Sequence, residues 1–200
     1  MTPKRVAVFI DYQNVYKRVR GAFDPTGVQP ATFGQIHPEK LGQRLAGADR
    51  RLVAVRVYRG LPSAKHDPRA SGAADRQVAA WRKLSLVTPI TRPLNYRDRG
   101  NPREKGIDVA LAVDFVMMAQ RKEFDVGVLV SADTDLLPAL EAVLGLLGDG
   151  SCEVGCWIPQ EGHAQVLRLR ERSMRVHGFY EADYRGFEDT TDYNVSRRRR

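Results

Sequence analysis

Two carboxylates, Asp133 and Asp135, stand one residue apart in the stretch LVSADTDLLPAL, between one apolar run and the next. A third acid, Asp11, ends the apolar run VAVFI, and a fourth, Asp108, opens the apolar segment KGIDVALAVDFVMMA on its core-facing stripe. Oxygen ligands without Cys or His suit Mg²⁺ or Mn²⁺. Two such ions about 4 Å apart can activate a water and stabilise the leaving oxygen when a phosphodiester is cleaved.

Each acid also has a simpler structural explanation. Asp11 and Asp135 could cap the helices that follow them, and Asp108 could favour a helix dipole. Together the acids favour a cation, because carboxylates within ~4 Å repel by about 4 kcal/mol per pair at an effective dielectric near 20. Asp114 lies about 240° around the expected helix from Asp108, so a solvated or ion-paired position and a functional one both stay open for it.

Short runs of Val, Ile and Leu recur along the chain between longer segments of helical character. They predict strands at 5–10, 51–60, 85–90, 125–131 and 151–158, with a last strand near 173–177. This alternation favours an α/β three-layer domain with a central parallel β-sheet. Ligands bind such sheets at the carboxyl ends of the strands, beside the point where strand order reverses. Asp11 ends the first strand, and Asp133 and Asp135 follow the fourth, so we expect them at one edge.

The length of 200 residues favours one domain, expected over residues 1–180, followed by a mobile basic tail over 181–200. Residues 21–37 and 91–104 are rich in Gly, Pro and Asn and are expected to be loops on one rim.

No apolar run approaches the ~18 residues of a membrane span, and VAVFI is too short for a signal peptide, so the expected compartment is the cytoplasm. Cys152 and Cys156 are too far apart on one strand to bridge, and we expect structural thiols.

The net charge of +8 and the pI near 9.8 favour a polyanionic partner, nucleic acid before phospholipid, unless the basic composition has no role. The loop before Asp108 carries arginines around an aromatic ring, which suits phosphate contacts and base stacking on a single strand of nucleic acid. Its candidates for these contacts are Arg92, Tyr96, Arg97, Arg99, Arg103 and Lys105. Further basic residues, Arg56, Arg59, Lys65 and Arg69, surround the end of the second strand. The alternative for these basic residues is that they are solvated loop charges with no ligand. The Arg197 to Arg200 cluster either adds a salt-sensitive contact to nucleic acid or has no role.

Three blocks, VAVFIDYQNV, KGIDVALAVD and VLVSADTDLLPAL, occur in this order along the chain. Together they resemble the signature blocks of NYN-domain proteins, including the LabA-like branch, within the PIN-like nuclease superfamily. The resemblance spans about residues 4–178. It implies a Rossmann-like, PIN-like three-layer fold and a metal-dependent ribonuclease, an endonuclease that acts in RNA processing or decay.

The resemblance also implies roles for particular residues. The catalytic and metal-binding set is Asp11, Asp108, Asp133 and Asp135, with Mg²⁺ or Mn²⁺ as the cofactor. The supporting set is Asn14, Ser131, Lys105 and Asp114, although turn and cap hydrogen bonding would also explain Asn14 and Ser131. Tyr12 stands where the family commonly has Gly, so it either narrows the pocket mouth or offers a stacking surface for a base.

The sequence alone leaves other functions open. A catalytically silent RNA-binding or adaptor module would gain nothing from an anionic pocket facing phosphates. A DNA or flap nuclease cannot be separated from a ribonuclease by sequence. A sugar-nucleotide transferase that used Asp133 and Asp135 would leave Asp11 and Asp108 unexplained. The sequence also leaves open whether the protein forms a homodimer, whether a partner inhibits it, and which RNA is its target.

Overall fold

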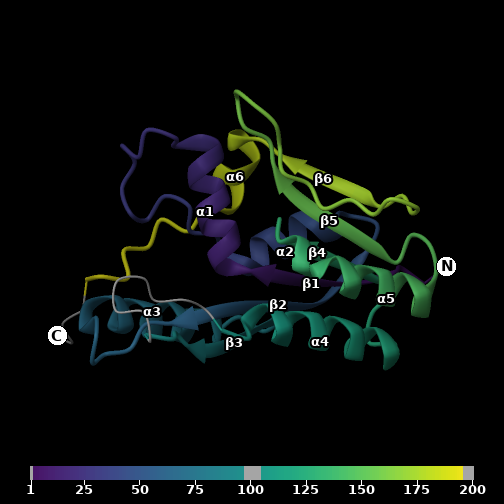
Figure 1. Ribbon diagram of the computed structural model, residues 1–200, viewed down its shortest axis with the longest axis horizontal. Coiled ribbons are helices and arrows are strands. Elements are labelled where there is room, and N and C mark those ends of the chain that lie inside the picture. The colour runs from purple at the N-terminus through teal and green to yellow at the C-terminus, as the bar shows by residue number, and fades with distance from the viewer. Residues whose placement is uncertain (1, 97–104, 196–200) are drawn as a thin grey trace.

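The computed structural model describes residues 2–96 and 105–195, and it contains one six-stranded sheet with the order β3-β2-β1-β4-β5-β6 (Figure 1). Every pair of neighbouring strands in it is parallel. The strands are β1 (Arg5–Asp11), β2 (Arg51–Leu61), β3 (Val87–Pro93), β4 (Val126–Val130), β5 (Cys152–Trp157) and β6 (Arg175–Phe179). The predicted α/β fold with a parallel sheet is therefore confirmed, and each predicted strand overlaps an observed one.

Helices cover both faces of the sheet. They are α1 (Tyr12–Phe23), α2 (Pro38–Ala46), α3 (Pro68–Trp81), α4 (Ile107–Gln120), α5 (Leu137–Leu147) and α6 (Glu181–Phe187), with a 3₁₀ turn, η1, at Thr134–Leu136. Because side chains alternate along a strand, Val6 and Val8 pack with α1, α2, α3 and α6, while Ala7 and Phe9 pack with α4 and α5. Two apolar cores therefore flank the sheet, as in a three-layer domain.

Gly127 in β4 lets aromatic side chains pack directly against the sheet in the core that contains α4 and α5. The rings of Phe115 in α4 and Phe124 lie directly over it, and an added Cβ would collide with Phe115 and stand 2.9 Å from Phe124 Cε2. The two rings stack with a centroid distance of 5.8 Å, and both contact Phe9 of β1 edge to face. The absence of a side chain at position 127 thus sets how closely α4 approaches the sheet and where its first residues lie.

The expectation of a mobile tail from residue 181 onward is wrong for the described part of that segment. Residues 181–187 form α6, in which Tyr184 and Phe187 are buried in the core. The Tyr184 hydroxyl accepts a hydrogen bond from the backbone N–H of Gly34 at 2.7 Å. Beyond α6 the chain continues toward α3, where the Tyr193 carbonyl accepts from Arg76 Nε at 2.7 Å (Figure 1). The cluster 197–200 lies outside the described residues.

Both cysteines lie in β5, and both are buried and free, as expected for structural thiols. Burial raises the pKa of Cys152 to about 12, which keeps this thiol protonated and unreactive at neutral pH. None of the described helices is long and apolar enough to cross a membrane.

Candidate active site

The sheet order places β1 beside β4, and the chain leaves these two strands toward opposite faces. The helix after β1, α1, packs on one face, and the helix after β4, α5, packs on the other. Ile10 of β1 lies opposite Val130 of β4, so the next residues, Asp11 and Ser131, meet at the carboxyl edge. This is the point where strand order reverses and where ligands bind in sheets of this type.

Asp11 is buried at this carboxyl edge, at the end of β1. Its side chain caps α1, since Oδ1 accepts from the backbone N–H of Asn14 at 3.2 Å. Its Oδ2 accepts from the Ser131 hydroxyl at 2.9 Å, and the residue is only 3% exposed. The structure thus brings Asp11 to the predicted edge, where it also has the capping role that its position suggested.

A short chain of hydrogen bonds fixes the turn after β4. Ser131 Oγ accepts from the Asp133 N–H at 3.1 Å, and Asn14 Oδ1 accepts from the Ala132 N–H at 3.0 Å. Asp133 Oδ1 in turn accepts from the Asp135 N–H at 3.0 Å, so Asp133 and not Asp135 is the capping acid of the turn. Asn14 and Ser131 therefore position the segment that carries the paired acids.

Asp108 lies in the first turn of α4, close behind Gly106, whose φ of 75° places the backbone in the left-handed region. Burial raises the pKa of Asp108, and the negative charges of Asp133 and Asp135 raise it further. Asp108 is therefore close enough to Asp133 and Asp135 to be repelled by both. Within the described residues none of the three forms an ion pair with a lysine or arginine.

A divalent cation would fit this chemistry, because it would neutralise a group of hard oxygen donors that has no protein cation. No three His, Cys, Asp or Glu side chains of the described residues are, however, already arranged as a metal site. Asp108, Asp133 and Asp135 would thus have to turn toward a shared ion as it binds. Asp133 is only partly buried and Asp135 is exposed, so this movement would cost little burial.

Asp114 does not join this group. Its Oδ2 accepts from Arg56 Nη2 at 2.7 Å and from the Tyr58 hydroxyl at 2.8 Å, so its carboxylate is bound to β2. The ion-paired position that the helical geometry left open is thus the observed one, and the supporting role predicted for Asp114 at the metal site has no basis in this arrangement.

Tyr12 cannot offer a stacking surface to a base, so that expectation is wrong. Its residue is 3% exposed, and its ring packs edge to face against Trp81 with a centroid distance of 4.8 Å. The hydroxyl accepts from Gln77 Nε2 at 2.8 Å, and burial raises its pKa to about 12. The Arg59 guanidinium lies 4.8 Å from the ring centroid. Tyr12 therefore helps to fix α1 against α3.

The described part of the basic loop lies on the β3 side of the edge. Arg92 and Lys105 are exposed. Tyr96 is half-buried: its ring stacks on His66 with a centroid distance of 4.1 Å, and its hydroxyl accepts from the Ser63 N–H at 2.9 Å. The predicted contacts of Arg97, Arg99 and Arg103 lie outside the described residues.

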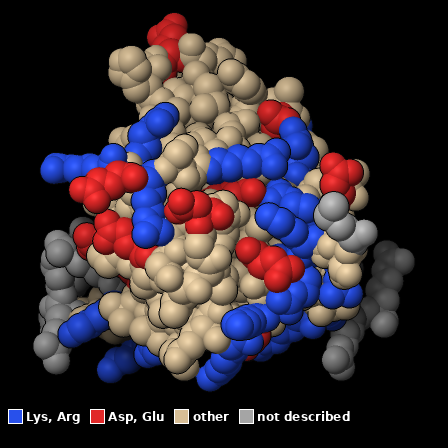
Figure 2. All heavy atoms as spheres, turned by 90° about the vertical axis from the view of Figure 1, so that its right-hand side faces the viewer, with Lys and Arg blue, Asp and Glu red and all other residues tan. Residues whose placement is uncertain are grey.

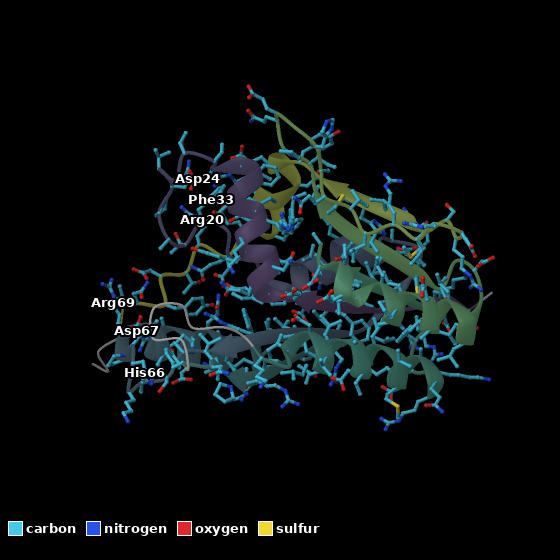
Figure 3. The ribbon with its side chains drawn as sticks, viewed as in Figure 1. Arg20, Asp24, Phe33, His66, Asp67 and Arg69 are labelled. Atoms are coloured by element: carbon cyan, nitrogen blue, oxygen red, sulfur yellow. The ribbon has the colours of Figure 1, made fainter. Side chains whose placement is uncertain are left out.

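Two loops stand on the same side of the molecule, one after α1 and one after β2 (Figure 3). In the first, Arg20 donates to Asp24 Oδ2 at 2.6 Å and to the carbonyls of Gln29, Pro30 and Phe33. In the second, Asp67 caps α3 by accepting from the Ala70 N–H at 2.8 Å. The first set of contacts ties the loop after α1 back to Arg20, and the second fixes the start of α3 at the end of the loop after β2.

A cavity of about 220 Å³ adjoins the acidic group on its β5 side. It shares Asn14 and Ser131 with the site and adds Lys17 and Arg18 from α1. Sequence reasoning missed it. The available signal was the spacing of Asn14, Lys17, Arg18 and Gly21, which places all four on one side of a helix.

On the face seen in Figure 2, acidic and basic side chains are mixed. Arginines of the described residues that pair with an acid include Arg5, which lies 2.8 Å from Asp125, and Arg172, which lies 3.5 Å from Asp149. The excess of positive charge therefore does not form a single basic patch on this face, which lies away from the loops labelled in Figure 3.

Comparisons with known proteins agree with the fold and the three sequence blocks. The chain is similar to a solved protein of unknown function from Vibrio parahaemolyticus, with a TM-score of 0.53, 19% identity, and coverage of 76% of this chain and 81% of that one. No match was found among curated proteins. The model of the NYN domain matches residues 5–148, which include Asp11, Asp108, Asp133 and Asp135. The chain therefore belongs to the NYN domain family, part of the PIN-like nuclease superfamily.

Proposed function

We propose that this protein is a Mg²⁺- or Mn²⁺-dependent endoribonuclease that hydrolyses phosphodiester bonds of single-stranded RNA. The observation that supports this best is the group formed by Asp108, Asp133 and Asp135 at the carboxyl edge. Asp133 and Asp135 both repel Asp108, none of the three has an ion-paired lysine or arginine among the described residues, and the protein carries a net charge of +8. A nuclease requires this combination, with negative charge for the metal and positive charge for the phosphates.

Each residue has a distinct part in this proposal. Asp108, Asp133 and Asp135 would hold the ion, which when bound would supply Lewis-acid stabilisation and a more acidic water. Asp11 lies at the same carboxyl edge, adds negative charge to the site and fixes Ser131 by accepting a hydrogen bond from its hydroxyl. Asn14 holds the backbone at Ala132, so that the turn presents Asp133 in a constant position.

RNA would approach from the side of Arg92 and Lys105, the two described basic residues of the segment 92–105, which are both exposed. Arg92 lies at the carboxyl end of β3, and Lys105 closely precedes α4, the helix that carries Asp108. Such side chains contact phosphates without reading sequence, and the RNA preference and the LabA-like assignment are predictions from family resemblance. Asp114 and Tyr12 have no direct role in this proposal.

The test is a cleavage assay on end-labelled single-stranded RNA, and on DNA of the same sequence, with Mn²⁺, Mg²⁺ or EDTA. The wild type should cleave RNA only with a divalent ion. Asp108→Asn and Asp133→Asn should lose at least about a hundredfold in rate, since each removes a metal ligand. Asp75→Asn, an exposed acid on α3, is the matched control and should cleave as the wild type does. Full activity of Asp133→Asn, or cleavage in EDTA, would refute the proposal.

A second candidate is an RNA-binding module of the same fold without catalysis. It is favoured by the lack of preassembled metal ligands in the described residues and by the engagement of both Asp11 oxygens. This candidate would be supported if the wild type bound RNA in a mobility-shift assay but left it intact with every divalent ion tested.

A further inference from the structure

The cavity beside the acidic group has a lining that differs sharply from the group itself. It lies between α1 and the carboxyl ends of β4 and β5, and part of the segment that follows β5 closes it. Its lining residues are Asn14, Lys17, Arg18, Gly21, Ala22, Ser131, Ala132, Gly155, Cys156, Trp157, His163 and Gln165. There is no Asp or Glu among them, although Ser131 and Ala132, which line the cavity, directly precede Asp133 in the chain.

The cations of this cavity are available to a ligand. Lys17 and Arg18 make no ion pair or side-chain hydrogen bond within the described residues. Their neighbour Arg20 on the same helix differs, because Asp24 and three backbone carbonyls already occupy its guanidinium. Two unpaired cations with His163 at a concave surface favour an anionic ligand.

The position of the cavity relates it to the acidic group. Ser131 lines it and also donates to Asp11, while its Oγ accepts from the Asp133 N–H. Asn14 lines it and also holds the turn at Ala132. A ligand that touches Asn14 and Ser131 in the cavity would thus lie next to the acids proposed to hold the metal.

Size and shape limit what the ligand can be. A volume of about 220 Å³ lies below the ~300–1,000 Å³ of pockets that enclose drug-sized molecules. Trp157 is only 7% exposed, since its ring packs on Phe179 and Phe187, so it offers little surface for base stacking. The thiol of Cys156 is buried and its pKa is raised by that burial, so it stays neutral. The cavity suits a phosphate and its sugar rather than a base.

We propose that this cavity is a subsite for the phosphate of a nucleotide flanking the cleaved bond, with Lys17 and Arg18 as its cationic contacts. This inference rests on the proposed function, because it assigns the neighbouring carboxylates to cleavage of the same strand. The phosphate belongs either to an internal phosphodiester or to a strand terminus. Recognition through the backbone makes this subsite independent of base sequence.

The test measures RNA binding without cleavage, in the full-length Asp133→Asn protein, by fluorescence anisotropy over a series of salt concentrations. Adding Lys17→Gln and Arg18→Gln should weaken binding of a short single-stranded RNA by about tenfold or more. The salt slope should fall by about 0.7 for each phosphate that the protein no longer neutralises. Lys40→Gln, an exposed lysine on α2 outside the cavity, is the matched charge control and should change neither quantity.

A steric variant tests the same subsite with both cations in place. Gly21 lines the cavity, and an added Cβ there would meet no atom within 4 Å, so Gly21→Phe can fold and fill the space. It should weaken RNA binding, whereas Gly145→Phe, which adds the same ring at an open position of α5, should not. Wild-type affinity in both the double variant and Gly21→Phe would overturn the subsite.

Two further measurements separate this inference from the proposed function. Comparing the affinities for RNAs with a 5′-phosphate, a 3′-phosphate or no terminal phosphate shows which phosphate the cavity binds. A higher affinity for one terminal phosphate that is lost in the Lys17 and Arg18 variant indicates a strand terminus. Equal affinity for all three RNAs indicates an internal phosphodiester. Mn²⁺ binding to the wild type and the double variant should be equal by electron paramagnetic resonance. If Asp133→Asn still cleaves RNA but the double variant binds RNA weakly, the subsite stands and the catalytic assignment fails.

Discussion

Replacing Glu153 with alanine should strongly destabilise the protein, because this buried carboxylate joins two largely buried basic side chains at the start of β5. Its Oε1 lies 2.7 Å from Arg50 Nη1, and its Oε2 lies 2.6 Å from His177 Nε2. The side chains of Arg50, Glu153 and His177 are only 14%, 7% and 11% exposed. Removing the shared carboxylate leaves the Arg50 charge buried without its counter-charge.

The expected loss in the free energy of unfolding follows from the short distances and low exposure of this ion pair. Breaking a buried ion pair costs about 3–5 kcal/mol. Arg50 keeps its hydrogen bonds to the carbonyls of Leu45 and Ala46, which favours the lower end of that range. A loss of about 3 kcal/mol corresponds to a fall in Tm of roughly 6–12 °C for a chain of this size. Glu153→Gln keeps the shape of the side chain and should recover part of the loss.

The assay is urea and thermal unfolding at pH 7, with Asp149→Ala as the control. Asp149 also pairs with an arginine, Arg172, but it is 85% exposed, so its loss should cost less than about 1 kcal/mol. If Glu153→Ala cost no more than Asp149→Ala, burial would not be what makes the Glu153 ion pair important for stability.

The same variant should show a defined pH dependence. Burial alone would raise the pKa of Glu153, but the hydrogen bonds and charges of His177 and Arg50 outweigh burial and hold it below its usual value of 4.5. A lowered folded-state pKa gives stability that is complete above the unfolded pKa and is lost as pH falls through the folded pKa. The difference between wild type and Glu153→Ala should therefore be constant from pH 7 to about 5 and narrow below about 4.5.

Two other substitutions test how the site is supported. Asp114→Asn removes the ion pair with Arg56, so it should lower stability by about 1 kcal/mol but leave Mn²⁺ affinity within about twofold; a large loss of Mn²⁺ affinity would return Asp114 to the metal site. Gly127→Ala drives a Cβ into the ring of Phe115 and should cost about 1–3 kcal/mol in urea unfolding. Gly145→Ala, at an open position of α5, should instead gain about 0.5–1 kcal/mol, and equal effects of the two glycine changes would contradict the packing argument.

Local patterns in the sequence were enough to predict the strands. Apolar runs marked the strands β1 to β5, most clearly β1 and β4, because a strand buried on both faces needs apolar side chains at successive positions. The last strand, β6, is mostly exposed, and only its approximate position near 173–177 was expected. The placement of Asp11 and Asp133 at one edge followed from the rule for parallel sheets, and the observed strand order places β1 beside β4 as that prediction requires.

Features that depend on distant contacts could not be predicted. The helix α6 has only seven residues and no clear period, and its position depends on Tyr184, which bonds to Gly34 from 150 positions away. Tyr12 directly follows an acid of the site, yet the start of α1 turns its ring toward Trp81. The partners of Asp114 could not be identified from sequence, because Arg56 and Tyr58 lie on a strand more than 50 residues earlier.

The most direct test of the central claim is to locate manganese in crystals of the wild-type protein by anomalous scattering. We predict an anomalous peak about 2.1 Å from carboxylate oxygens of at least two of Asp108, Asp133 and Asp135, a distance typical of direct coordination. The peak should disappear in crystals of Asp133→Asn grown and soaked in the same way. Manganese bound elsewhere, with no peak among these acids in a preparation that cleaves RNA, would contradict the account.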